Sequence, residues 1–255
     1  MLQVTDFTKR YGRLTALSEV SFSIGRAEVL GLIGPNGSGK TTLFECLGGV
    51  LPLDSGRVRT QGRALSAAER AAAMFYLPDA IAPWPAQTVR WALDFVVGFF
   101  GTAGSPVAQA FRPASAVDAG LKPCATTEIV RELDLGSLLD SRIGELSKGQ
   151  RKRVLLAIGL LTPQPVLLAD EPFDGLDLRQ SHDVARTLRV QAEAGRTMFL
   201  SIHQISDAAR VCDRFVLLSG GRARGEGTGE ELAALAAARG SSAGNDLEEV
   251  FLALT

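Results

Sequence analysis

The chain has 255 residues, of which 46% are hydrophobic, so it is long and apolar enough to bury one large core or two small ones. Its formal net charge is -1 and its basic residues are scattered, which argues against direct binding of nucleic acid. The cysteines, Cys46, Cys124 and Cys212, lie too far apart for the paired spacing of a zinc site, and their odd number does not suggest a disulfide framework.

The start of the chain predicts a small lobe of antiparallel strands. The first six residues lack the basic and apolar regions of a signal peptide, and no apolar run reaches the roughly 20 residues that span a bilayer, so we expect a cytoplasmic chain. Val20, Phe22 and Ile24 alternate with polar residues, as in a strand buried on one face. Residues 56–62 are typical of a second short strand between turns.

Continuous apolar runs predict the strands of a mainly parallel sheet that is buried on both faces. They comprise residues 29–33, 166–169, 198–200 and 215–218. Helical patterns alternate with these runs, which favours right-handed crossovers and an α/β fold. We expect one domain over residues 1–255, with an inserted helical lobe at about 80–150 and a short C-terminal helix at about 246–255.

The predicted helical lobe contains one strongly apolar segment and one polar, small-residue segment. Residues 89–100 are apolar around most of a helix. Residues 101–122 are rich in Gly, Ala, Ser and Pro and predict a long loop. Residues 239–246 are expected to form a linker to the terminal helix.

A glycine-rich loop stands between the first apolar run and an amphipathic helix. It matches G-x-x-x-x-G-K-[ST], and we assign nucleotide binding to Gly34, Pro35, Asn36, Gly37, Ser38, Gly39, Lys40, Thr41 and Thr42. Glycines let backbone N–H groups close on phosphate oxygens, and the helix N-terminus adds positive potential. Lys40 is expected to reach the β and γ phosphates and Thr41 to hold Mg²⁺. The alternative, a simple Gly-rich turn, does not explain why strand, loop and helix are in register, so we predict ATP binding on a P-loop NTPase core.

Polar residues follow two other buried runs at the ends where α/β proteins place ligands. Asp170 is suited to organise Mg²⁺, and Glu171 to orient and polarise a water for attack at the γ phosphate. His203 follows the run that ends at Ile202 and can donate a hydrogen bond to the same phosphate. A solvated acidic pair and a structural histidine are the alternatives.

Together with residues 146–150, Leu-Ser-Lys-Gly-Gln, these segments resemble the ATP-binding subunit of ABC transporters over almost the whole chain. The family's signature is Leu-Ser-Gly-Gly-Gln, from which this chain departs at Lys148. Residues 170–172 and 174–177 resemble the family's second nucleotide motif and its D-loop. The resemblance implies that His203 is the switch histidine and that Tyr11 stacks on adenine. Taken alone, residues 146–150 equally fit a turn and N-cap that open a helix.

The resemblance also implies partners. Ser147, Gly149 and Gln150 of one subunit would close over ATP held by Lys40 of a second subunit, in a head-to-tail homodimer or heterodimer. A separate transmembrane permease would hold the chain at the inner face of the cell membrane. Residues 91–100 are a candidate docking surface, with the core of the helical lobe as the alternative.

The direction of transport has a weaker signal at the end of the chain. Residues 247–255 resemble the tail of exporter subunits, which favours export. An ordinary amphipathic helix that seals the sheet is compatible with either direction. The substrate has no sequence signal, because the permease lines its pathway.

Asp79 stands where the family usually has a glutamine that touches Mg²⁺ and the attacking water. A carboxylate is a better metal ligand than an amide, so Asp79 joins Thr41 and Asp170 as a candidate metal ligand, yet it adds negative charge beside the triphosphate. Intact hydrolysis and slower or differently coupled hydrolysis, as in a regulatory subunit, both stay open. A soluble ATP-driven clamp is a further alternative, although the chain has one cassette and no heptad arms. A GTPase is disfavoured because neither Asn36 nor Asn245 precedes lysine.

Overall fold

The computed structural model describes residues 1–79, 81–101, 123–240 and 247–255, and it contains two sheets. The smaller sheet has four antiparallel strands in the order β2-β1-β4-β5. They are β1 (Leu2–Tyr11), β2 (Leu14–Ile24), β4 (Ser55–Thr60) and β5 (Arg63–Leu65). Both strands predicted from residues 20–24 and 56–62 belong to this lobe.

The larger sheet has six strands in the order β10-β9-β3-β8-β7-β6. They are β3 (Val29–Ile33), β6 (Met74–Leu77), β7 (Val166–Asp170), β8 (Thr197–Ser201), β9 (Arg214–Ser219) and β10 (Arg222–Gly227). Every neighbouring pair is parallel except the antiparallel pair of β9 and β10. The predicted α/β fold with a mainly parallel sheet is confirmed.

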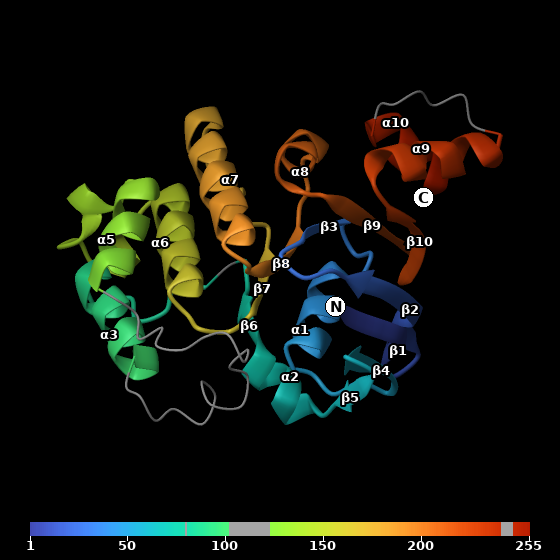
Figure 1. Ribbon diagram of the computed structural model, residues 1–255, viewed down its shortest axis with the longest axis horizontal. Helices are drawn as coiled ribbons and strands as arrows, with labels where there is room; N and C mark the ends of the chain where they lie inside the picture. The colour runs from blue at the N-terminus through green and yellow to red at the C-terminus, as the bar shows by residue number, and fades with distance from the viewer. Residues whose placement is uncertain (80, 102–122, 241–246) are drawn as a thin grey trace.

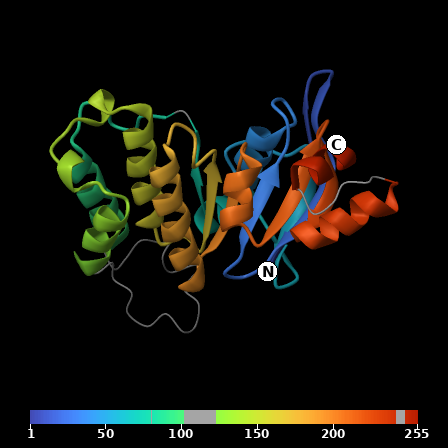
Figure 2. The same ribbon diagram turned by 90° about the horizontal axis from the view of Figure 1, so that it is seen from above.

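Helices cover the sheet and form a lobe at one end of the molecule. They are α1 (Lys40–Leu47), α2 (Ala67–Ala73), α3 (Val89–Gly101), α5 (Pro123–Glu132), α6 (Lys148–Leu160), α7 (Leu178–Glu193), α8 (Ile205–Val211), α9 (Gly229–Ala238) and α10 (Leu247–Leu254). Figures 1 and 2 show α3, α5 and α6 gathered at the end opposite to the antiparallel sheet. The loop predicted over residues 101–122 and most of the predicted linker over 239–246 lie outside the described residues. Within the described ranges, no helix has the length and apolarity needed to cross a membrane.

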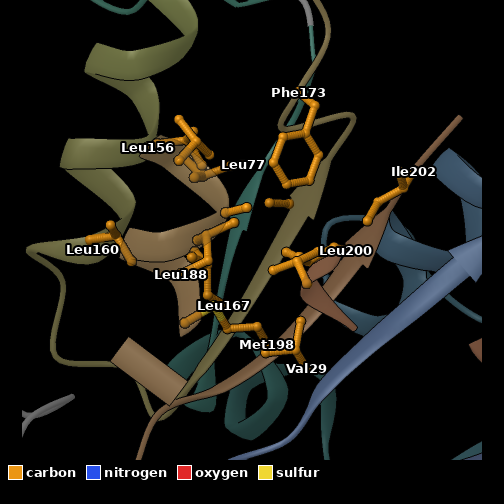
Figure 3. Close-up of a cluster of buried hydrophobic side chains, with 14 of the residues drawn as sticks. Val29, Leu77, Leu156, Leu160, Leu167, Phe173, Leu188, Met198, Leu200 and Ile202 are labelled. Atoms are coloured by element: carbon orange, nitrogen blue, oxygen red, sulfur yellow. The ribbon is translucent and has the colours of Figure 1, made fainter. Parts of the chain in front are cut away.

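Alternating side chains give the parallel sheet a core on each face. Leu30 and Leu32 join the cluster beneath α1 and the antiparallel sheet. Leu167 and Leu200 point to the other face, toward α6 and α7, as Figure 3 shows. Burial of each such leucine contributes about 1.5–3 kcal/mol. Packing on both faces fixes the parallel strands, so the residues that follow their C-terminal ends are held at one edge.

The two cysteines whose side chains the structure describes are shielded. Cys46 is buried and Cys212 is partly buried. Burial raises the pKa of the Cys46 thiol to about 11, and it also raises the pKa of Cys212. Both thiols therefore stay protonated and unreactive at neutral pH.

Candidate active site

The glycine-rich loop joins β3 to α1 and holds its lysine against the loop backbone. Lys40 is buried, and its Nζ donates to the carbonyl oxygens of Gly34 at 2.7 Å and Pro35 at 3.4 Å. Gly39 has a φ of 105°, and a Cβ there would stand 2.7 Å from the carbonyl oxygen of Ala16. The first amides of α1 lack a side-chain cap, so this helix N-terminus is free to bind an anion.

Asp170 at the end of β7 is held by two hydroxyl groups. Thr41 Oγ1 on α1 donates to Asp170 Oδ2 at 2.8 Å, and Ser201 Oγ on β8 donates to Asp170 Oδ1. Asp170 and Ser201 are paired in register across the two strands. Thr41 and Asp170 thus present hard oxygen atoms side by side, which fits Mg²⁺ that takes its remaining ligands from phosphates and water.

Glu171 lies next in the chain and has an unusual backbone. Its φ is 48°, in the left-handed region that non-glycine residues rarely occupy. Its N–H donates to the Ser201 carbonyl oxygen and hydroxyl, both at 3.1 Å, which holds this turn in place. The pKa of Glu171 is raised, mainly by burial and also by Asp170, while Lys40 and His203 act in the opposite direction.

A cavity of about 440 Å³ opens beside Glu171 at the C-terminal edge of the sheet. Its lining includes Asn36 of the glycine-rich loop, Asp79 after β6, and the exposed His203 after β8. The structure therefore brings these three predicted site residues together around Glu171. Asp79 also has a partner that the sequence did not suggest, because its Oδ1 accepts a hydrogen bond from Lys152 Nζ at 2.6 Å.

The Leu-Ser-Lys-Gly-Gln segment opens α6. Ser147 is the N-cap, with its Oγ accepting from the Gln150 N–H at 3.3 Å and its own N–H donating to Gln150 Oε1 at 2.9 Å. Gly149 is buried against Gly175, whose carbonyl oxygen would stand 2.5 Å from a Cβ at position 149. Lys148 forms an ion pair with Asp174. Ser147 is therefore an N-cap, as the alternative interpretation of this segment expected, and the segment is joined to residues 174–175 of the same chain.

Tyr11 lies elsewhere, at the end of β1 in the antiparallel sheet. Tyr11 is 46% exposed, and Lys9 Nζ lies over one face of its ring, 5.5 Å from the ring centroid. An exposed aromatic face of this kind is free to stack on a base.

The order of these elements matches a known family. A family model described as "ABC transporter" matches residues 17–174, which is more than half of the chain. The chain belongs to the ABC transporter family. It therefore binds and hydrolyses ATP as the ATP-binding component of a transport system that works with a membrane partner.

Individual relatives agree with this assignment. The chain is 33% identical over 219 residues to a zinc transport system ATP-binding protein of Treponema pallidum, covering 86% of this chain and 78% of the relative. It is 32% identical over 233 residues to a Nod factor export ATP-binding protein of Rhizobium etli, covering 91% and 69%. A solved ATP-binding subunit of an ABC transporter superposes with a TM-score of 0.79 and 27% identity over 100% of this chain and 99% of that one. A dimeric cassette bound to ADP and Pi is similar in fold, with a TM-score of 0.69 and 23% identity over 89% and 98%.

Two features of this ABC site were missed at the sequence level. Ser201 is fully buried and polar, yet it ends a mostly apolar strand and was not among the predicted site residues. A lone polar residue in a buried run is the signal that could have found it. Lys152 has no comparable signal, because its partner Asp79 lies 73 residues away in the chain.

The raised pKa of Glu171 predicts how its substitution changes stability with pH. Ionisation of Glu171 is disfavoured in the folded chain, where its pKa is raised. The ionised carboxylate therefore lowers the stability of the fold as pH rises through 4.5, the ordinary pKa of glutamate, and beyond. We expect Glu171→Gln to melt at a higher temperature than wild type at neutral pH, in EDTA and without nucleotide. The difference should shrink as pH falls toward 4.5. Scanning fluorimetry across this pH range measures the two melting temperatures, and Glu193→Gln, which changes an exposed carboxylate, is the control. A melting temperature of Glu171→Gln at or below that of wild type at neutral pH would contradict the expectation.

Proposed function

We propose that the chain hydrolyses ATP at a composite site in a head-to-tail dimer and thereby drives a permease at the inner face of the cell membrane. The observation that carries this proposal is the cluster at the C-terminal edge of the parallel sheet. There the loop lysine, the Thr41–Asp170 pair and the cavity of Glu171 and His203 lie within one continuous region. Each group has the chemistry that phosphoryl transfer requires.

Each residue of this cluster has a proposed role in ATP hydrolysis. Lys40 and the first amides of α1 bind the β and γ phosphates. Thr41 and Asp170 would hold Mg²⁺, which neutralises phosphate charge when it is bound. Glu171 orients and polarises the attacking water, since it lines the cavity and its raised pKa makes it a better proton acceptor. His203 donates a hydrogen bond to the γ phosphate.

The signature segment supports a site shared between two chains. Ser147 caps α6 with its side-chain Oγ, which accepts from the Gln150 N–H, and the N-terminus of this helix carries positive potential. In a head-to-tail dimer this end of α6 would meet the γ phosphate bound to the other chain. Gly175 contacts Gly149 closely, so the D-loop would move with the signature segment. A solved cassette of the same fold is itself dimeric.

An exposed row of rings on the helical lobe supports docking of the permease. Trp91, Phe95 and Phe99 lie on one face of α3 and are 40%, 42% and 60% exposed. Trp84 packs edge-on against the first two rings, with centroids 5.7 and 5.2 Å away. We call these four side chains the aromatic surface. The opposite face of α3 is buried in the core, so the two alternatives for residues 91–100 describe different faces of one helix.

Removal of two central rings tests this docking. We expect Trp91→Ala/Phe95→Ala to lower co-purification with the permease at least about tenfold, because aromatic side chains dominate such interfaces. ATP affinity should stay unchanged, since neither Trp91 nor Phe95 lines the cavity beside Glu171. Leu252→Ala removes an apolar side chain on α10 that is 75% exposed, more than either ring, and is the control. Unchanged co-purification of the double variant would contradict docking at the aromatic surface. Phe100 is a poor choice because it packs against the core.

Export is the proposed direction of transport. Relatives named for Nod factor export support it, whereas relatives named for zinc and manganese transport leave the substrate class open. The membrane partner decides the direction and the substrate, because it lines the transport pathway. Identification of the co-purified permease, followed by ATP-driven flux in inside-out vesicles, tests the direction: accumulation of substrate inside such vesicles supports export, and loss of preloaded substrate contradicts it.

A further inference from the structure

The ion pair between Asp79 and Lys152 joins the parallel sheet to the signature helix. Lys152 lies on α6, and its side chain is only 5% exposed. Its Nζ donates to Asp79 Oδ1 at 2.6 Å and to the Asp79 carbonyl oxygen at 3.3 Å. Asp79 follows β6 and lines the cavity that also contains Glu171. A buried ammonium thus contacts the carboxylate of a residue that lines this cavity.

The charges around this cavity explain why such a partner is needed. Glu171 lies at the same edge as Asp79, because β6 and β7 are adjacent and parallel. A triphosphate placed here would add more negative charge. Like charges in a partly buried site repel strongly, since the effective dielectric constant is far below that of water. An uncompensated Asp79 would therefore oppose binding of the terminal phosphate.

Lys152 is also held where it can act. The next residue, Arg153, donates from NH1 to the carbonyl oxygens of Leu133 and Asp134, each at 2.9 Å. This contact ties α6 to the end of α5 and fixes the turn of the helix that carries Lys152. A buried ammonium without its partner would be costly, so the pair is expected to persist in the folded chain.

We propose that Lys152 is a positioning residue of the ATPase site, which neutralises Asp79 so that the cavity accepts the γ phosphate. Asp79 and Lys152 together carry no net charge, as the glutamine usual at position 79 carries none. In this arrangement Asp79 binds the ammonium of Lys152 rather than Mg²⁺. The inference rests on the proposed location of the γ phosphate in this cavity.

Affinities for ATP and ADP, measured with the purified full chain and fluorescent nucleotides, test the inference. We expect Lys152→Met to lower the affinity for ATP at least about tenfold and the affinity for ADP less than about threefold. Only ATP brings a γ phosphate near the unpaired carboxylate of Asp79. Lys152→Arg should bind ATP as wild type does. Asp79→Gln/Lys152→Met should return ATP affinity to within about threefold of wild type, because the charge that Lys152 opposes is gone.

Controls separate this effect from misfolding and from metal binding. Arg131→Met removes an exposed cation from the same lobe and should change neither affinity. Urea unfolding identifies a folded variant, and Lys152→Gln replaces Lys152→Met if the latter does not fold.

Four results would contradict the proposal or its premise. The proposal would be overturned if the double variant bound ATP as weakly as Lys152→Met does, or if Lys152→Met lost equal affinity for ATP and ADP. A rise of about fivefold or more in the Mg²⁺ concentration that half-saturates ATP binding by Asp79→Gln would make Asp79 a metal ligand. If Lys40→Met left ATP affinity unchanged, the proposed phosphate location would fail instead.

Discussion

Glu171→Gln is expected to lower the rate of ATP hydrolysis at least about 100-fold while ATP stays bound. The amide keeps the shape of the side chain but cannot accept a proton from the attacking water. Lys40, Thr41 and Asp170 remain in place, so the phosphates keep their ligands. Because the nucleotide is not consumed, the closed dimer should accumulate.

Phosphate release and size-exclusion chromatography in the presence of ATP and Mg²⁺ measure this expectation. Glu193→Gln, which removes an exposed carboxylate at the end of α7, is the matched control and should hydrolyse ATP at the wild-type rate. Equal rates for wild type and Glu171→Gln would remove Glu171 from the mechanism. A purely monomeric Glu171→Gln with bound ATP would count against the shared site.

Features with a local cause could be predicted from the sequence. The apolar runs before Gly34 and Asp170 identified two strands of the parallel sheet, because burial on both faces demands such runs. Close backbone contacts require the glycines of the loop, as at Gly39, so the spacing of these glycines can be recognised in the sequence. The same logic placed His203 at a strand end.

Features that depend on distant contacts could not be predicted. Residues 91–100 look apolar around most of a helix, yet their burial separates an exposed face, with Trp91 and Phe95, from a buried one with Leu93. Only the packing of α3 on the core decides which face is which. Lys152 on α6 and Asp79 after β6 meet for the same reason: the sheet and the helical lobe must be assembled before the pair exists.

Gly149→Ala is expected to lower hydrolysis at least about 100-fold while a single chain still binds ATP with an affinity within about threefold of wild type. The added Cβ would lie 2.5 Å from the Gly175 carbonyl oxygen, which belongs to the backbone and cannot rotate away. Either the N-terminus of α6 or the D-loop must shift, at a cost of about 1–3 kcal/mol in stability. Lys40→Met, in contrast, keeps Gly149 intact and should lose the binding of ATP.

Mixing these two inactive variants tests whether the site is shared. In a head-to-tail dimer, the Lys40 of the Gly149→Ala chain meets the Gly149 of the Lys40→Met chain, which gives one intact site in each mixed dimer. Random pairing should therefore restore about a quarter of wild-type activity, since half of the dimers are mixed and each has one of two sites. Phosphate release is measured before and after mixing, with each variant mixed with itself as the control. If a single chain completed its own site, mixing would restore nothing, because every chain would keep its defect.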